Sequence, residues 1–591
     1  MVFTSIDHLP YFFPLLGTVL LLVLFFLGTA VLGITKKQTY LLLSYYYVVF
    51  AAFVVLVDVF VRLGVSYTVA IFFISIIILG LSLTGYWKKR EQIVSWLKYE
   101  KAHRIQWVTL LVVMVFSTFI FSKFIFNNGL HDEYQHHAAV EDMLQTNHWP
   151  IRDELRYGID LSDYYHYGWY YLVILVTSVT NASIEVSLDI AKLILFFPIL
   201  PLFYSLVQRF LQTKWYTSLS IAVLLLVQGP AFLFLDAYTG NVFFSQGNEI
   251  IYEPLFFQLA GITWFGIILL VAFATVVHNL VQKSLSIKAV LFAVFFTWSL
   301  YILNKVFLLI FIPFSVLLII NSYQNTIENL LRKHKKIWMM GVLSLPFIAL
   351  GLYLGITMVS PIFFTLLRGD SGIPFVRSFR LWGFPYSSHD GLAFQPAFSW
   401  GSLRAFGIMP LISGAVLLWS IFSNKNKYKT VLILLFWLFL WIVPVALNFS
   451  GSELALNKFY IPALWVSVLI TIHFLLQQKV RIQIVGVGLL FSAMLAPSVY
   501  FSSISLQNSH RYWKYSDPII KYLSEENKLI TASIDDYEYA KYLINNLDIQ
   551  LISARTPNID IAEVVEYEVT TENHVDEKPL AQTDTHYLYA K

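Results

Sequence analysis

The chain has 591 residues, of which 58% are hydrophobic and 13% are charged, and its formal net charge is +4. Soluble globular domains carry about 25% charged residues, so this composition excludes a soluble globule and indicates a polytopic membrane protein. The small positive charge favours an orientation signal over affinity for nucleic acid. Because the chain has no cysteine, disulfides, thiolate metal sites and a cysteine nucleophile are excluded.

Apolar runs of spanning length recur along most of the chain, and about 20 such residues cross a bilayer core. The first run, residues 9–34, is too long for the core of a signal peptide, so we expect it to remain a membrane helix. The runs centre near residues 22, 51, 76, 117, 198, 226, 267, 296, 312, 347, 414, 439, 467 and 490. They predict an all-α membrane protein with about 14 transmembrane helices.

Basic clusters between these runs set the expected orientation. Placing all of them in the cytoplasm gives one alternating path with both termini outside, provided that residues 164–180 do not cross as a full span. We therefore expect a juxtamembrane or re-entrant helix there. The loops predicted on the external face cover residues 127–163, 235–254 and 360–404.

This pattern predicts three regions. Residues 1–105 form the N-terminal transmembrane helices, and residues 106–501 form the transmembrane region that carries the external loops. Residues 502–591 are rich in Asp and Glu and contain only short apolar runs. We expect this tail to be a small soluble α/β domain outside the membrane.

The densest cluster of ionisable residues follows the run centred near residue 117, in the sequence His131-Asp132-Glu133-Tyr134-Gln135-His136-His137. A carboxylate in a partly desolvated cavity can have its pKa tuned for general-base catalysis. Asp132 and Glu133 are therefore the catalytic candidates, and a solvated loop acid is the plain alternative.

A metal is the other chemistry to consider in this cluster. Glu133 and His137 lie one helical turn apart and have metal-ligand character. The sequence is not His-Glu-x-x-His, so we expect no stable metal and no other cofactor, although a divalent cation remains the alternative. We expect His136 and His137 to line a cavity or to bond to carboxylates, with His166 lining the same cavity.

Further ionisable residues are predicted at the same face. Asp236, Glu249 and Glu253 form a second acidic site. The cations are Lys305, Arg377, Arg380 and Lys458. Arginine forks and lysine point charges stabilise phosphate oxygens, so we expect the cations to bind a phosphate. Anchoring of the acids at the interface and snorkelling of the lone lysines are the alternatives.

Taken together, these motifs resemble the GT-C-fold membrane glycosyltransferases, a class that includes protein O-mannosyltransferases and the lipid A aminoarabinose transferase. The stretch from Asp132-Glu133-Tyr134 through Met143-Leu144 to Trp149-Pro150 is similar to the first external loop of that family. Leu235-Asp236, Asn304-Lys305, and Phe449-Ser450 with Lys458-Phe459-Tyr460-Ile461-Pro462 resemble its later motifs in the same order. The chain departs from the family at Val306, where Gly is usual, and at Tyr164-Tyr165-His166-Tyr167, where Pro-Pro is usual.

The resemblance implies an inverting transfer of a sugar from a polyprenyl-phosphate donor to a glycan, lipid or protein acceptor on the external face of the cell membrane. Asp132 would be the general base. Lys305, Lys458 and one of Arg377 and Arg380, with Tyr460 beside Lys458, would hold the donor phosphate. The implied partners are the donor, the acceptor and membrane lipids, without nucleic acid.

Three other functions remain open on the sequence alone. A ligase or polymerase of lipid-linked glycans would use the loop at residues 360–404 more than Asp132. A transporter or flippase would place intramembrane charges on a translocation path, and Asp58 suits that function better than transfer. A non-catalytic scaffold is disfavoured because acids and bases gather on one side.

Overall fold

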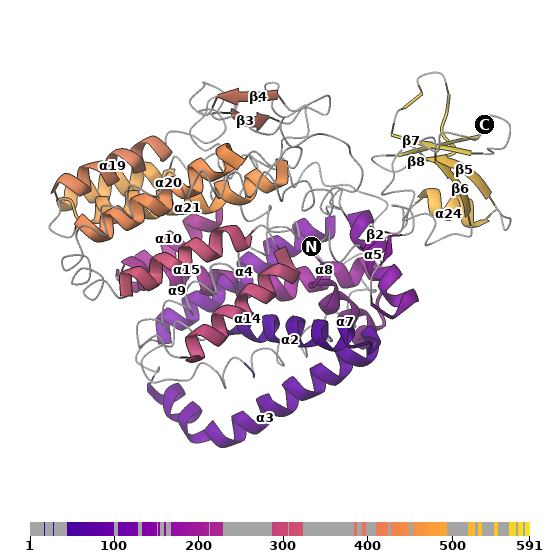
Figure 1. The fold of residues 1–591 in the computed structure, drawn as a ribbon, viewed down its shortest axis with the longest axis horizontal. Coiled ribbons are helices and arrows are strands. Elements are labelled where there is room, and N and C mark those ends of the chain that lie inside the picture. The colour runs from indigo at the N-terminus through magenta and orange to yellow at the C-terminus, as the bar shows by residue number, and fades with distance from the viewer. Residues whose placement is uncertain are drawn as a thin grey trace, which may run out of the picture.

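The structure is a computed structural model, and Figure 1 shows its fold. It describes residues 44–99, 104–127, 133–149, 167–211, 213–227, 287–304, 307–322, 409–423, 427–447 and 453–492 of the helical region. In the C-terminal region it describes residues 518–525, 530–534, 549–553, 567–571, 573–574, 577–582 and 586–590. Residues 17 and 28 and the short segments 152–153, 159–160, 383–386 and 393–396 complete the described set.

The described residues are mostly helical. The helices of the first half are α2 (Ser44–Arg62), α3 (Tyr67–Tyr99), α4 (Arg104–Asn127), α5 (Glu133–Thr146), α7 (Tyr170–Thr180), α8 (Ile184–Phe196), α9 (Ile199–Leu211) and α10 (Trp215–Val227). They are followed by α14 (Ile287–Asn304), α15 (Leu308–Ser322), α19 (Met409–Ser423), α20 (Lys427–Leu447), α21 (Glu453–Leu476) and α24 (Pro518–Glu525).

Three described helical segments are long and apolar enough to cross a membrane. They are Tyr45–Arg62, Tyr67–Gln92 and Ile184–Gln208, and several shorter apolar helices accompany them. Membrane character is therefore confirmed. The count of about 14 spans and the assignment of sides remain predictions.

The helices other than α24 pack into one body (Figure 1). Its core includes many aromatic side chains of α2, α7 and α8. Pro198 has no N–H, so the carbonyl of Ile194, four residues earlier, loses its intrahelical donor. The buried Tyr46 hydroxyl donates to that carbonyl at 2.8 Å, and the Tyr47 hydroxyl donates to Leu195 O at 2.7 Å. These two bonds fix α2 against the end of α8.

Helix α7 is short and enclosed. It has 11 residues, and Tyr170 to Val176 are all buried. At about 1.5 Å per residue it extends about 16 Å, roughly half of a hydrocarbon core. The described helix is therefore shorter than a full span, and the statement that residues 164–180 do not cross the membrane stays a prediction.

The C-terminal region contains a five-stranded mixed sheet in the order β6-β5-β7-β9-β8. Its strands are β5 (Ile530–Ile534), β6 (Ile549–Ser553), β7 (Tyr567–Thr570), β8 (Ala581–Gln582) and β9 (Tyr587–Ala590). β5 runs parallel to β6 and β7, whereas β9 runs antiparallel to β7 and β8. Together with α24, which contacts β8, this sheet confirms the predicted α/β character of the tail (Figure 1).

Two short antiparallel pairs lie in segments predicted as external loops. β1 (Arg152–Asp153) pairs with β2 (Ile159–Asp160). β3 (Gly383–Tyr386) pairs with β4 (Ala393–Pro396).

Candidate functional site

Helix α5 begins at Glu133, directly after Asp132, and packs against α3, α7 and α8. At its other end Asn147 adopts a left-handed conformation with φ 51°. The first N–H groups of a helix have no intrahelical acceptor, and Asn147 supplies two acceptors to the start of α3. Tyr67 N–H donates to Asn147 O at 3.1 Å, and Thr68 N–H donates to Asn147 Oδ1 at 3.2 Å. The C-terminal end of α5 is thereby attached to α3.

His136 attaches α5 to α7. Its Nδ1 lies 2.8 Å from the Tyr170 hydroxyl, and its ring centroid lies 5.6 Å from that of Trp169. Burial disfavours the imidazolium, and the nearby Lys192 charge adds to this effect, so the pKa of His136 lies well below its ordinary value. His136 is therefore a neutral hydrogen-bonding residue near pH 7.

His137 attaches α5 to α8. Its Nε2 lies 2.9 Å from Glu185 Oε1, and its Nδ1 lies 3.6 Å from Glu141 Oε2. Burial raises the pKa of Glu141, and the His137 charge opposes that rise. His137 is therefore within hydrogen-bond distance of the Glu185 carboxylate and within ion-pair distance of the Glu141 carboxylate. Its predicted place in a cavity lining stays a prediction, as does that of His136.

A second polar cluster lies around Asp58, which is fully buried in α2. Its Oδ2 accepts hydrogen bonds from Arg62 Nε at 3.0 Å and from Trp298 Nε1 at 3.3 Å. Its Oδ1 accepts from the hydroxyls of Tyr167 at 2.9 Å and Tyr171 at 3.2 Å. Arg62 Nη2 also donates to the Tyr167 hydroxyl at 2.9 Å. We call these five residues the Asp58 cluster.

The Asp58 cluster brings together α2, α7, α14 and Tyr167, which lies three positions before α7. Next to it, Gly168 N–H donates to Ile302 O at 3.3 Å, near the end of α14. A Cβ at Gly168 would overlap the Ile302 side chain and would lie 2.9 Å from Val54 Cγ1. A glycine is therefore what lets the chain entering α7 approach α14 so closely.

The start of α7 is thus a common anchor for α5 and α14. Tyr170 contacts His136 on α5, and Gly168, two residues earlier, bonds to Ile302 on α14. α14 ends at Asn304, the residue before Lys305. The helix that follows the acidic cluster and the helix that precedes the candidate lysine are therefore both bonded to the start of α7.

Most of the predicted site residues lie outside the described residues. These are Asp132, His166, Asp236, Glu249, Glu253, Lys305, Arg377 and Arg380. Glu133 is the first residue of α5, and Lys458 and Tyr460 lie within α21, where only the backbone is described. Among the residues that the structure describes, no group of three or more His, Asp or Glu is placed to hold a metal. The second acidic site and the phosphate-binding set therefore stay predictions.

Sequence reasoning missed the Asp58 cluster as a unit. The spacing of Asp58 and Arg62, one helical turn apart in an apolar run, was the available signal for an ion pair. Tyr167 lies in the Tyr-rich segment already singled out, but nothing in the sequence pairs it with a residue 109 positions away. Trp298, 240 positions from Asp58, carried no signal at all.

Comparison with known proteins adds no family to this description: neither a protein-family model nor a curated protein matches the chain.

Proposed function

We propose that the protein is a GT-C-like membrane glycosyltransferase that moves a sugar from a polyprenyl-phosphate donor to an acceptor on the extracytoplasmic face, with inversion. The observation that carries the proposal is the common anchor at the start of α7. It bonds both to α5, which begins at the residue after Asp132, and to α14, which ends at the residue before Lys305. An acid just before α5 and a cation just after α14 suit glycosyl transfer, which needs a general base and a cation that stabilises the leaving phosphate.

In this reaction the acceptor hydroxyl or amine attacks the anomeric carbon of the sugar. Asp132 takes the proton from the acceptor as the new bond forms, and the bond from the anomeric carbon to the phosphate oxygen breaks on the opposite side. The leaving polyprenyl phosphate carries the negative charge away, and Lys305, Lys458 and one loop arginine stabilise it. Glu133 is the second carboxylate of the same site.

The contacts of Asp58 do not favour the transporter alternative. A carboxylate on a translocation path has to exchange its partners with the transported substrate. Asp58 instead accepts hydrogen bonds from Arg62, Tyr167, Tyr171 and Trp298 and is fully buried. The charge of Asp58 is compensated within the fold, so a structural role suits this residue better than a role in transport.

The test is turnover of lipid-linked sugars by the purified protein in proteoliposomes. A panel of polyprenyl-phosphate sugars is offered with an envelope extract as acceptor, and the release of polyprenyl phosphate is followed. Asp132→Asn keeps the size of the side chain but removes its basicity, so release should fall by about 10²- to 10⁴-fold while the donor still binds.

His148→Gln is the matched control, because His148 is exposed just beyond α5, and its turnover should stay unchanged. A chelator should also leave wild-type turnover unchanged, whereas a metal-dependent reaction would stop and recover on addition of metal. Near-normal turnover by Asp132→Asn would contradict the proposal.

A further inference from the structure

Arg62 lies where the phosphates of a bilayer are expected. It is the last residue of a candidate membrane span, Tyr45–Arg62, and the chain turns directly after it towards α3. Its side chain is 34% exposed, although its partner Asp58 is fully buried. A charged residue at the end of a spanning helix reaches the headgroup level, where lipid phosphates lie.

The guanidinium is held rigidly by three groups. Nε donates to Asp58 and Nη2 donates to the Tyr167 hydroxyl, so one edge of the fork is occupied. The Trp149 ring lies against the face of the guanidinium, with 4.2 Å between Arg62 Cζ and the ring centroid. Among the described residues, no acceptor takes a hydrogen bond from Nη1 of Arg62. A fixed guanidinium with an open edge binds an oxyanion at little entropic cost.

The charge arrangement also favours an anion on the outer side. Asp58 is buried beneath Arg62, so the pair forms a dipole whose positive end points towards the exposed edge. Three neutral donors, from Tyr167, Tyr171 and Trp298, share the carboxylate with Arg62. An approaching phosphate meets the positive end of the pair before the buried carboxylate.

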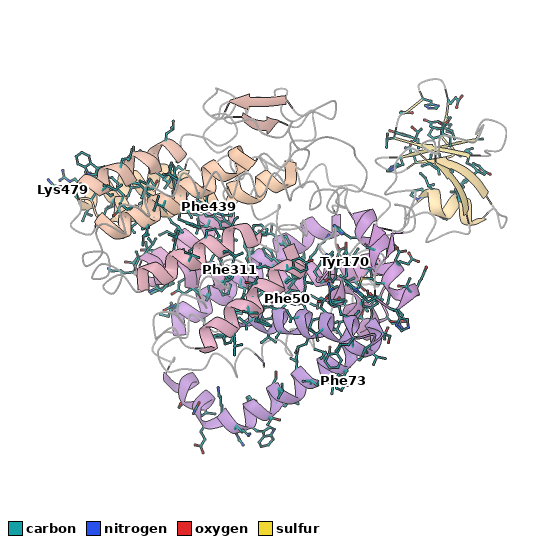
Figure 2. The ribbon with its side chains drawn as sticks, in the orientation of Figure 1. Phe50, Phe73, Tyr170, Phe311, Phe439 and Lys479 are labelled. Atoms are coloured by element: carbon teal, nitrogen blue, oxygen red, sulfur yellow. The ribbon has the colours of Figure 1, made fainter. Side chains whose placement is uncertain are left out.

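Exposed apolar side chains occur in α2, in the turn directly after Arg62 and in α3. Val59 is 39% exposed, Leu63 is 75% exposed and Phe73 is 48% exposed. The Phe73 ring lies 5.5 Å from the Phe60 ring, two residues before Arg62, and Figure 2 shows Phe73 at the outer edge of the helical body. A guanidinium that can bind a phosphate beside an apolar surface suits an amphiphile better than a free anion.

We propose that Arg62, held by Asp58, Tyr167 and Trp149, is a binding site for the phosphate group of a membrane lipid, with the lipid chain lying along the α2–α3 hairpin. This proposal can be tested separately from the proposed sugar transfer, because lipid binding is measured without turnover. The phosphate can come from a polyprenyl phosphate or from a bilayer phospholipid, and the experiment distinguishes these two sources.

The experiment is native mass spectrometry of the purified full-length protein in detergent, titrated separately with polyprenyl phosphate, phosphatidylglycerol and inorganic phosphate. The main variant is the double substitution Asp58→Asn with Arg62→Gln, which removes both charges and so leaves no buried carboxylate unpaired. It should bind the lipid phosphate at least about tenfold more weakly, because a charge-assisted fork is lost.

Two further variants separate binding from folding. Asp58→Asn alone keeps the guanidinium and removes the opposing charge, so lipid-phosphate binding should be retained or strengthened. Arg90→Gln is the matched control, because Arg90 is exposed on α3 outside the cluster, and its binding should stay within about twofold of wild type.

The outcomes then decide the site and the source of the phosphate. A loss for polyprenyl phosphate alone assigns the site to a lipid carrier, and a loss for both lipids assigns it to lipid phosphates in general. Inorganic phosphate should bind far more weakly than either lipid. Binding of both lipids by the double variant within about twofold of wild type, or an equal loss in Arg90→Gln, would overturn the proposal.

Discussion

At the scale of single residues, the buried charge of Asp58 explains why four other side chains are where they are. A carboxylate within an apolar helix is costly unless it is paired and hydrogen-bonded. Arg62 supplies the opposite charge, and Tyr167 and Tyr171 supply neutral donors. The cluster therefore compensates Asp58 and also links α2 to the start of α7.

The first prediction compares loss of one charge with loss of both. Arg62→Gln leaves the Asp58 carboxylate buried without its cation, which should destabilise the protein by about 3–5 kcal/mol. Combining it with Asp58→Asn removes that carboxylate, so the double variant should be more stable than the single one. Thermal unfolding in detergent measures both, and equal losses would contradict the account of Asp58 as a charged, compensated residue.

The second prediction concerns His136 and acidic pH. Its folded pKa lies well below the ordinary value of 6.5, so below pH 6.5 the unfolded chain binds a proton that the folded protein does not. The contribution of His136 to stability is therefore complete above about pH 6.5 and is lost as the pH falls below it.

We expect the unfolding temperature of the wild type to fall more between pH 7.5 and 5.5 than that of His136→Gln, which has no such group. Glu141 acts in the opposite sense: its folded pKa is raised above 4.5, so its contribution to stability grows as the pH falls. Glu141→Gln should therefore show a steeper acid loss than wild type when the profile is continued down to about pH 4.5. Parallel profiles for all three proteins would show that neither group titrates with folding.

At the scale of elements, α5 is attached at both ends. His136 and His137 bond to α7 and α8, and Asn147 bonds to the first turn of α3. Both ends of α5 are therefore attached to its neighbouring helices. The start of α7, where Gly168 approaches Ile302, is bonded both to α5 and to α14.

The third prediction uses that close approach. Gly168→Ala places a methyl group against the Ile302 and Val54 side chains, so the helices must move apart, which should cost about 1–3 kcal/mol. Gly80→Ala is the matched control, since nothing lies within 4 Å of an added Cβ there and Ala favours a helix. Thermal unfolding should show a loss for the first variant only, and an equal effect of both would contradict the tight contact.

The elements also show how far sequence reasoning reached. Hydrophobic length located α2, α3 and the α8–α9 segment, because spanning runs are long and local. The α/β nature of the tail was likewise readable from its composition and its short apolar runs. The strand order β6-β5-β7-β9-β8 was not, because pairing between strands distant in sequence leaves no local pattern. Contacts distant in sequence leave no local pattern, so Tyr167 and Trp298 could not be predicted as partners of Asp58 either.

At the scale of the whole molecule, the contacts agree with one alternating path through the membrane. The turn after α2 lies beside the end of α5, because Tyr67 and Thr68 bond to Asn147. On the predicted path both segments are external. The 29 residues from Tyr67 to Ser95 in α3 extend about 42 Å, more than a hydrocarbon core, so we expect the far part of α3 on the other side.

The fourth prediction tests these sides by labelling single cysteines, which the chain allows because it has none of its own. Leu63→Cys, His148→Cys and Lys578→Cys should react with an impermeant reagent added outside the cell. Ser95→Cys should react only after the cytoplasmic side is opened. Labelling of Lys578→Cys from the cytoplasmic side alone would place the tail inside and remove the basis for an external donor site.

The central claim is that the acid after α4 and the lysine after α14 share one site, and cross-linking tests it most directly. A protein with Asp132→Cys and Lys305→Cys is treated with bifunctional maleimides of increasing length. We predict a cross-link with a reagent of about 15 Å reach, roughly twice the Debye length at physiological salt. Leu63→Cys with His148→Cys serves as the positive control, and Asp132→Cys with Ser95→Cys as the negative one. A product from the positive control without any product from positions 132 and 305 would contradict the claim.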